Sequence, residues 1–197
     1  MARTRAFDRA DVVRAALGVF WRTGYEAASI PELERETGLS RSSIYNSFES
    51  KRGLFDATVQ YYLDEVVRPR LRPLLADDAA PDAIIEYLTG LRAALLRPDS
   101  LPAIGGCLLI SAAGTPIAND PIVADTIAAY RSELHSALHR GVVAHALGIA
   151  PEDAARIANA CTGQVIAAFA LVRVSPAESA QALTTALELV TSHSPSV

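Results

Sequence analysis

Two histidines lie four residues apart in a segment of helical pattern, and this spacing suits a metal ion. His135 and His139 would lie one turn apart on the same helix face, where two imidazoles can bind one zinc ion. No third ligand accompanies them at a specific spacing, and the nearby Arg131 and Arg140 would repel a cation. A metal-dependent enzyme is therefore the least favoured function, and we expect no metal and no cofactor.

The two cysteines lie in apolar segments. Cys107 follows Gly105 and Gly106 and precedes three aliphatic residues, whereas Cys161 lies in an alanine-rich segment. Such cysteines most often pack in a core or line a pocket, and a redox role for Cys107 is the less favoured alternative. The sequence contains no phosphate-binding glycine loop, no dinucleotide-binding glycine motif and no serine nucleophile elbow. We therefore expect that this protein is not an enzyme.

A third group of polar residues points to a nucleic acid. The helix predicted over residues 41–47 has an outer face without a carboxylate, which consists of Arg41, Ser42, Ser43, Tyr45 and Asn46. A helix that faces only solvent normally includes acids. Hydroxyl and guanidinium groups donate to phosphate oxygens, and short side chains let a helix approach a groove closely. This face is therefore predicted to read DNA.

The neighbouring elements would hold this helix at a fixed angle. The segment from Ser29 to Glu32 has the pattern of a capping box, and the short helix that it begins stops at Gly38. Ser40 is placed to cap the next helix, so two short helices flank a tight turn, as in a helix-turn-helix. The residues predicted to pack inward against the first helix are Ile30, Leu33, Leu39, Ile44 and Phe48.

The remaining chain also has a helical pattern, which predicts an all-α fold of about nine helices. The first helix should end just before Gly24. A fourth should run from Lys51 through Tyr61 and Tyr62, and Pro69 and Pro73 should end or bend it. Four prolines stand where first-turn prolines open long helices, namely Pro81, Pro121, Pro151 and Pro176. A shorter apolar helix is expected over residues 103–113.

Charge and hydropathy divide the chain into two predicted domains. Residues 1–52, the helix-turn-helix domain, contain nine Lys or Arg and seven Asp or Glu, whereas residues 53–197 contain nine and fifteen. The second domain is expected to sense a ligand and to form a dimer, and the fourth helix is shared between the two. No signal sequence or membrane span is recognised, so we expect a cytoplasmic protein.

These motifs together resemble the tetracycline-repressor (TetR) family of transcription regulators over about residues 10–60. The residues that carry the resemblance are Gly38-Leu39-Ser40, Tyr45-x-x-Phe48, Ser50-Lys51 and Leu54-Phe55. The resemblance implies a homodimer with three-helix DNA-reading heads and a ligand-sensing C-terminal body. It also implies that Tyr45 and Lys51 contact phosphate and that residues 41–46 face the bases. Glu34 departs from the family pattern, which usually has a small residue there.

Three sets of site residues follow. The predicted DNA-binding residues are Ser29, Ser40, Arg41, Ser42, Ser43, Tyr45, Asn46, Lys51, Arg3 and Arg5, of which the last two could equally belong to a tail. The candidates for an apolar ligand pocket are Tyr87, Cys107, Ser111, Tyr130, His135 and Phe169. The predicted dimer interface, on the last two helices, consists of Ile157, Val165, Ala168, Val172, Leu183, Leu187 and Val190.

The favoured function is a regulator, by default a repressor, that binds a pseudo-palindromic operator in double-stranded DNA. A small lipophilic or aromatic effector would release it by favouring a different separation of the two heads. The alternatives are a helical ligand-binding or scaffold protein that does not bind DNA and, least favoured, the enzyme built on His135 and His139.

Overall fold

Capping residues and prolines divide the chain into helices. The computed structural model describes residues 8–192 and contains no β-strand within that range. The α-helices are α1 (Arg9–Ala27), α2 (Ile30–Thr37), α3 (Arg41–Phe48), α4 (Lys51–Tyr62), α5 (Arg68–Leu75), α6 (Ala83–Leu96), α7 (Leu101–Gly105), α8 (Leu108–Ala113), α9 (Pro121–His145), α10 (Pro151–Leu171) and α11 (Pro176–Thr191). A π-helical segment η1 (Leu63–Val67) joins α4 to α5, and a 3-10 turn η2 (Pro116–Asn119) precedes α9. These residues thus have the all-α fold that the sequence predicts.

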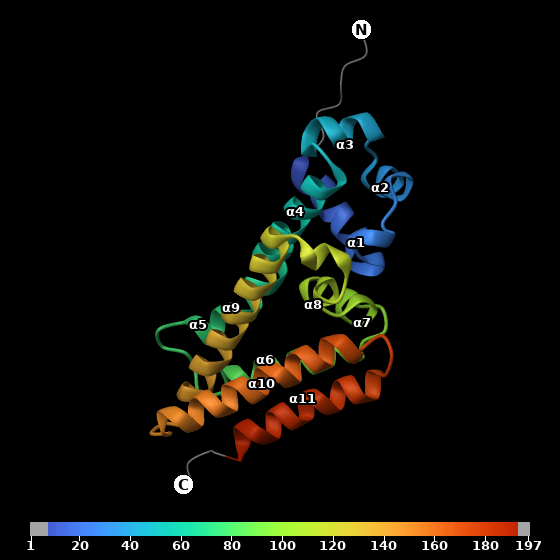
Figure 1. Cartoon of the computed structure of the whole chain (residues 1–197). Helices are drawn as coiled ribbons and strands as arrows, with labels where there is room; N and C mark the ends of the chain where they lie inside the picture. Colours follow the sequence, from blue (N-terminus) through green and yellow to red (C-terminus); the bar gives the residue numbers. More distant parts are fainter. Residues whose placement is uncertain (1–7, 193–197) are drawn as a thin grey trace.

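The molecule is elongated, with a small helical head at one end and a helix pair at the other (Figure 1). The head, defined as α1, α2, α3 and the first turns of α4, contains the helix-turn-helix. The body consists of the remaining helices, and α10 and α11 run side by side at the end opposite to the head (Figure 1). The long helix α9 extends from the head side of the body towards this pair, so it connects the two ends.

The first helix is interrupted at the glycine that was expected to follow its end, and it continues to Ala27. Gly24 has φ 79° and ψ 170°, which interrupts the helical backbone, and a last short turn follows as far as Ala27. Glycine adopts this positive φ without the penalty that a Cβ imposes.

The fourth helix continues farther than its prolines suggested. After Tyr62 the backbone widens into the π segment η1, and Pro69 then occupies the first turn of α5, where its missing N–H is tolerated. The helix ends at Leu75, two residues beyond Pro73. One helix with a local π irregularity therefore connects the head to the body.

The single helix predicted over residues 103–113 is wrong, because two short helices occupy this segment. Ser100 caps α7 at Leu101, and the helix stops at Gly106, which has φ 65°. A Cβ on Gly106 would lie 2.4 Å from the carbonyl oxygen of Phe169, so only glycine allows this close approach of α10. Cys107 then precedes α8.

The predicted dimer-interface residues require a correction. Six of the seven are at most 3% exposed within one protomer, namely Ile157, Val165, Ala168, Val172, Leu183 and Val190, and Leu187 is half-buried. The apolar stripes of α10 and α11 face each other, α9 and α6, so they form the protomer's own core. A side chain without exposed surface cannot contact a second copy, so an interface on these two helices would have to use their outer faces.

Two segments have the length and hydropathy of a membrane span, residues 101–119 and 151–171. The first is divided among α7, α8 and η2, so it does not form one continuous helix. The second is α10, which packs against α9 and α11 as a core helix.

Candidate nucleic-acid interface and cavity

Helix α3 has one buried side and one exposed polar side. Ile44 and Phe48 are buried beneath it, and Leu33 of α2 is buried beside them. Ile30 and Leu39 pack against the same core at its edge. All five apolar residues predicted to face inward therefore do so, which fixes the angle at which the opposite side of α3 projects.

The exposed side of α3 carries the predicted polar residues. Arg41, Ser42, Tyr45 and Asn46 are exposed, and Ser43 is half-buried. The guanidinium carbon of Arg41 lies 5.6 Å from the centre of the Tyr45 ring, so the cation and the aromatic ring form one surface. The described part of this surface contains no carboxylate on α3 itself.

Serine side chains begin the two helices of the motif. The Oγ atom of Ser29 accepts a hydrogen bond from the backbone N–H of Glu32, at 3.3 Å, and Ser40 accepts one from Ser43, at 3.2 Å. The Ser40 hydroxyl also lies 2.9 Å from that of Ser42. These predicted contact residues are thus helix caps that remain exposed at the ends of α2 and α3.

Glu34 joins the two helices of the motif. Its Oε1 atom accepts a 2.5 Å hydrogen bond from the backbone N–H of Arg41, the first residue of α3. Gly38, with φ 71°, provides the left-handed turn that brings the end of α2 back towards α3. The residue that departs from the family pattern therefore caps α3 with a carboxylate.

Lys51 is held against the end of α1. Its Nζ atom donates to the carbonyl of Glu26, at 3.3 Å, and lies 4.6 Å from the centre of the Tyr25 ring. Burial lowers the pKa of Lys51, although the nearby Glu26 carboxylate opposes this effect. The side chain is half-buried, so its ammonium group has a fixed position at the head surface.

Arg9 is a further residue that supports α3, although no sequence pattern indicates it. Its Nη1 atom donates to the carbonyl of Ser47, at 3.0 Å, and its guanidinium lies 4.4 Å from the centre of the Phe48 ring. Arg9 therefore supports the C-terminal end of α3, and no motif or spacing indicates this contact. The predicted residues Arg3 and Arg5 lie outside the described part of the chain.

The body contains a cavity of about 420 Å³. Its walls are mostly apolar, and the residues that line it include Trp21, Tyr62, Leu71, Leu91, Leu134 and Phe169. Of the six predicted pocket residues, Tyr87, Tyr130 and Phe169 line it.

The other three predicted pocket residues do not line the cavity. The hydroxyl of Ser111 donates to the carbonyl of Gly105, at 3.1 Å. His135 lies on the other side of α9, with Nδ1 3.3 Å from the hydroxyl oxygen of Thr162. Helical periodicity identified α6, α9 and α10, which line the cavity, but not the side of α9 that faces it, and α8, which carries Ser111, does not line it.

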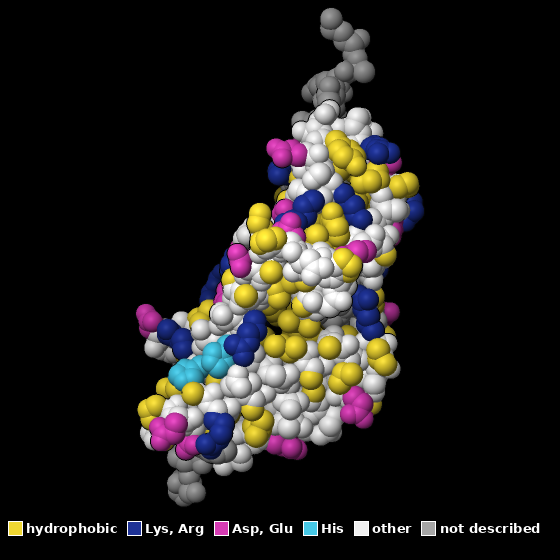
Figure 2. Space-filling view, viewed as in Figure 1, with side chains coloured by type: hydrophobic (Ala, Val, Ile, Leu, Met, Phe, Trp, Pro, Cys, Tyr) yellow, Lys and Arg dark blue, Asp and Glu magenta, His cyan; other side chains and the backbone are white. Residues whose placement is uncertain are grey.

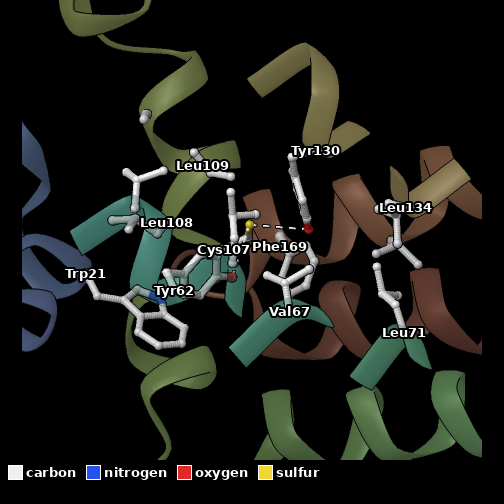
Figure 3. Close-up of a cluster of buried hydrophobic side chains, with 14 of the residues drawn as sticks. Trp21, Tyr62, Val67, Leu71, Cys107, Leu108, Leu109, Tyr130, Leu134 and Phe169 are labelled. Carbon is white, nitrogen blue, oxygen red and sulfur yellow. Dashed lines mark hydrogen bonds between the residues drawn. The ribbon is translucent and has the colours of Figure 1, made fainter. Parts of the chain in front are cut away.

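Cys107 lies behind the cavity wall between two tyrosines. The hydroxyl of Tyr62 donates to its Sγ atom, at 3.3 Å, and the thiol donates to the hydroxyl oxygen of Tyr130, at 3.4 Å (Figure 3). Burial raises the pKa of both tyrosines well above the ordinary value. The cysteine therefore belongs to a buried chain of hydrogen-bonded side chains.

The metal site is not supported. Burial, and then the charges of Arg131 and His139, lower the pKa of His135. Among residues 8–192, no group of three or more His, Cys, Asp or Glu side chains is arranged to hold a metal ion.

Trp21 connects the head to the cavity. No sequence pattern indicates this contact. It belongs to α1, yet it lines the cavity, and its indole N–H donates to the carbonyl of Gly106, at 3.0 Å. Its ring packs edge-to-face against Tyr62, with 4.9 Å between ring centres (Figure 3). Arg173, at the end of α10, donates to the carbonyl of Trp21, at 3.0 Å.

Two polar contacts strengthen the same junction. Arg52 of the head forms a two-point ion pair with Asp120, the cap of α9, with N–O distances of 2.6 and 3.1 Å. The carboxylate of Glu26 accepts a hydrogen bond from the backbone N–H of Ile117, at 2.8 Å. The head therefore contacts the body at several points. The domain boundary predicted after residue 52 falls within α4.

Comparison with known proteins agrees with this geometry. Residues 12–58 match the family model for bacterial regulatory proteins of the tetR family. Over 143 residues the chain is 30% identical to the HTH-type transcriptional regulator YezE of Bacillus subtilis (strain 168), which covers 73% of this chain and 72% of YezE. It is 29% identical to the HTH-type transcriptional repressor ComR of Escherichia coli (strain K12), over 64% of this chain and 59% of ComR.

The fold is also similar to solved structures. A cysteine variant of the TetR family transcriptional regulator CifR, complexed with 26-base-pair operator DNA, is 28% identical, with a TM-score of 0.76 over 95% of this chain and 98% of that one. A TetR transcriptional regulator from Chloroflexus aurantiacus J-10-FL is 26% identical, with a TM-score of 0.73 over 93% of each chain. The helix-turn-helix with its polar outer face, the family match and these relatives together make the chain a member of the TetR family of DNA-binding transcriptional regulators.

Proposed function

We propose that this regulator is a homodimeric repressor whose heads bind a pseudo-palindromic operator and whose body binds a small effector that releases the DNA. The observation that carries the proposal is the acid-free polar face of α3, held rigidly by Ile44 and Phe48 beneath it. Two relatives, ComR and BdcR of Escherichia coli, are described as repressors, which supports repression. Because operator DNA lies in the cytoplasm of a bacterium, we assign the protein to that compartment.

Contacts to DNA would divide between phosphates and bases. Arg41 is an exposed cation at the start of α3, Lys51 is a half-buried cation at the start of α4, and Tyr45 is exposed on α3 with a hydroxyl. These groups suit phosphate oxygens, whereas Ser42 and Asn46 are short polar side chains that suit base edges in the major groove. In a two-fold dimer, the two α3 helices would enter successive major grooves about 34–36 Å apart.

Release would follow from the contact between Trp21 and the cavity. Trp21 is both a residue of the head and part of the cavity wall, so a ligand there touches the head directly. A ligand shifts the equilibrium between two head positions only by its difference in affinity for them, typically about 1–3 kcal/mol of coupling. The hydrogen bond from Trp21 to Gly106 is the contact that such a ligand would disturb.

A dimer would use the outer faces of α10 and α11. Gly163 lies in the middle of α10, where a Cβ would meet nothing within 4 Å, so the protomer itself does not require glycine there. Glycine in a helix costs about 1 kcal/mol relative to alanine, and a close approach by a second helix explains its presence. Ala170 and Val174 are exposed on or just beyond the same helix.

The direct test is a binding assay with the intergenic DNA next to the protein's own gene. A retarded complex with this DNA, but not with an unrelated fragment of equal length, is expected. Absence of any shift at low salt would favour the alternative of a ligand-binding protein that does not use DNA.

The dimer is tested by sedimentation of Gly163→Leu beside Ala93→Leu, which changes an exposed alanine on α6. The α10 variant should sediment as a monomer and the α6 variant as a dimer. Dimers from both variants would exclude the outer face of α10.

A further inference from the structure

We propose that the effector is a small organic monoacid, whose apolar part fills the body cavity and whose carboxylate is held at the cavity mouth by Arg70 and Arg97. This inference rests on the proposed function and specifies the class of effector. The class of ligand follows from the polarity of the cavity, and it can be tested separately from the release of DNA.

The cavity size and walls suit a compact apolar group. The volume of about 420 Å³ lies in the lower part of the range of about 300–1,000 Å³ that is usual for small-molecule sites. Trp21, Leu71, Leu134 and Phe169 form apolar walls around it (Figure 3). Figure 2 shows that hydrophobic side chains also surround the hollow in the body surface above α10 and α11.

Two arginines lie where the cavity opens. Arg70 and Arg97 line both the cavity and an adjoining depression that extends to Asp99 and Pro102. Arg70 donates to the backbone carbonyl of Val66, at 2.5 Å. Within residues 8–192, neither guanidinium forms an ion pair with a carboxylate. A carboxylate can accept two hydrogen bonds from such a group, in a geometry that lysine does not offer.

The lining of the cavity includes a hydroxyl donor, on Tyr87, and a positive charge, on Arg70. The hydroxyl of Tyr87 has no hydrogen-bond partner in the described part of the chain, although Tyr87 lines the cavity. Burial raises the pKa of Tyr87, and the positive charge of Arg70 partly opposes this rise. The charge of Arg70 also opposes the rise in the pKa of Tyr62. An anionic group in the cavity can accept hydrogen bonds from Arg70 and from the Tyr87 hydroxyl, which both line it.

The acids near the mouth limit the charge of the ligand. Glu86 lines the cavity and Asp99 lines the depression, and both are exposed. The two carboxylates offset the charge of the two arginines, so each further negative charge on a ligand meets more repulsion. A ligand with one carboxylate, which the arginines can bind directly, therefore fits better than a phosphate ester or a diacid.

The chain carries its own optical reporter for this test. Trp21 is the only tryptophan in the sequence, and it lines the cavity. Its fluorescence should respond directly to a bound ligand. The free full-length protein is titrated with two matched pairs, phenylbutyrate against phenylbutyramide and octanoate against octanamide, and with phenylbutylamine as the cationic counterpart. In at least one pair the carboxylate should bind about tenfold more tightly than its amide, as a charge-assisted hydrogen bond provides, and the amine should bind most weakly.

The variants Arg70→Gln and Arg97→Gln, singly and together, test whether these two guanidinium groups bind the carboxylate. The double variant should bind the carboxylate about tenfold more weakly and the amide as before. Arg72→Gln is the matched control, because Arg72 is exposed on α5 like Arg70 but does not line the cavity. It should behave like the parent protein.

Three results would overturn the inference: no response to either carboxylate at millimolar concentration, an amide or amine that binds at least as well, or an anion preference that persists in the double variant. DNA release is measured separately with the same compounds. Carboxylates that bind without releasing DNA would contradict the proposed effector mechanism but not the ligand class. Release by the amides alone would contradict the ligand class but not the mechanism.

Discussion

The indole N–H of Trp21 donates a 3.0 Å hydrogen bond to the backbone carbonyl of Gly106. Trp21 belongs to the head, whereas Gly106 is the left-handed residue between α7 and α8 of the body. A Cβ on the preceding Gly105 would lie 2.3 Å from the indole ring, so the two segments approach as closely as glycine allows. The position of the head is thus fixed at the wall of the cavity.

The substitution Trp21→Phe tests this attachment. Phenylalanine keeps an aromatic ring but removes the donor, so the carbonyl of Gly106 loses its partner and the free energy of unfolding should fall by about 1–3 kcal/mol. Urea unfolding followed by circular dichroism measures the change. Tyr25→Phe serves as the control, because no hydrogen bond of its hydroxyl is found in the described residues, and it should change stability by about 0.5 kcal/mol or less. Equal stability of the parent protein and Trp21→Phe would show that the hydrogen bond does not hold the head.

The α3 surface gives two substitutions with different salt dependence. Arg41→Ala removes a cation beside phosphate, so DNA affinity should fall and the slope of log affinity against log salt should become shallower by about 0.9. Tyr45→Phe removes a neutral hydroxyl, so affinity should fall while the slope stays the same. Fluorescence anisotropy at several salt concentrations measures both, with Arg72→Ala on the body as control. An unchanged slope for Arg41→Ala would remove Arg41 from the phosphate contacts.

Glu34 is expected to have two opposing effects. Its carboxylate caps α3 but adds a negative charge near the DNA-facing surface. Glu34→Gln keeps an acceptor for the N–H of Arg41 and removes the charge, so DNA binding should tighten at low salt and the gain should shrink as salt screens it. Glu34→Ala loses the acceptor and should destabilise the protein by about 1 kcal/mol. Weaker DNA binding by Glu34→Gln at low salt would mean that the charge itself contributes to recognition.

Because of the ion pair between Arg52 and Asp120, the free energy of unfolding should depend on pH in the acidic range. The hydrogen bond from Arg52, helped by the backbone N–H groups of Val123 and Ile122, lowers the pKa of Asp120 below its ordinary value of 3.8. A carboxyl whose pKa is depressed in the folded state adds stability above the unfolded pKa and loses it as the pH falls through the folded pKa.

The matched variant for this ion pair is Asp120→Asn, which keeps the helix cap but not the charge. The parent protein should therefore be more stable than the variant near pH 7, and the gap should close below the ordinary pKa of 3.8. Urea unfolding over this range measures the gap, and a gap that widens in acid would contradict the role of the pair.

The head was predictable from sequence because its signals are local. Ser29, Gly38 and Ser40 act through bonds to residues three or four positions away, and the burial of Ile44 and Phe48 follows from helical spacing. The confirmed family and fold rest on these local patterns.

The cavity and the junction were less predictable because they depend on contacts between residues far apart in the chain. Trp21 meets Gly106 across 85 positions and Arg173 across 152. An apolar stripe shows that one side of a helix is buried, but it does not distinguish the protomer core from a partner. Six of the seven residues predicted for the dimer interface lie in the protomer core for this reason. Val165 and Leu183 are fully buried inside one copy.

The helical segment from Lys51 to Leu75, formed by α4, η1 and α5 without a loop between them, restricts how chain length can vary within the family. Every residue in an α-helix turns the following part by about 100°, so one inserted or deleted residue between the head and the body would rotate their side chains out of register. A surface loop absorbs such a change without effect on its neighbours. Length differences among relatives should therefore collect at residues 76–82 and 146–150, and the segment that contains the π turn should keep a constant number of residues.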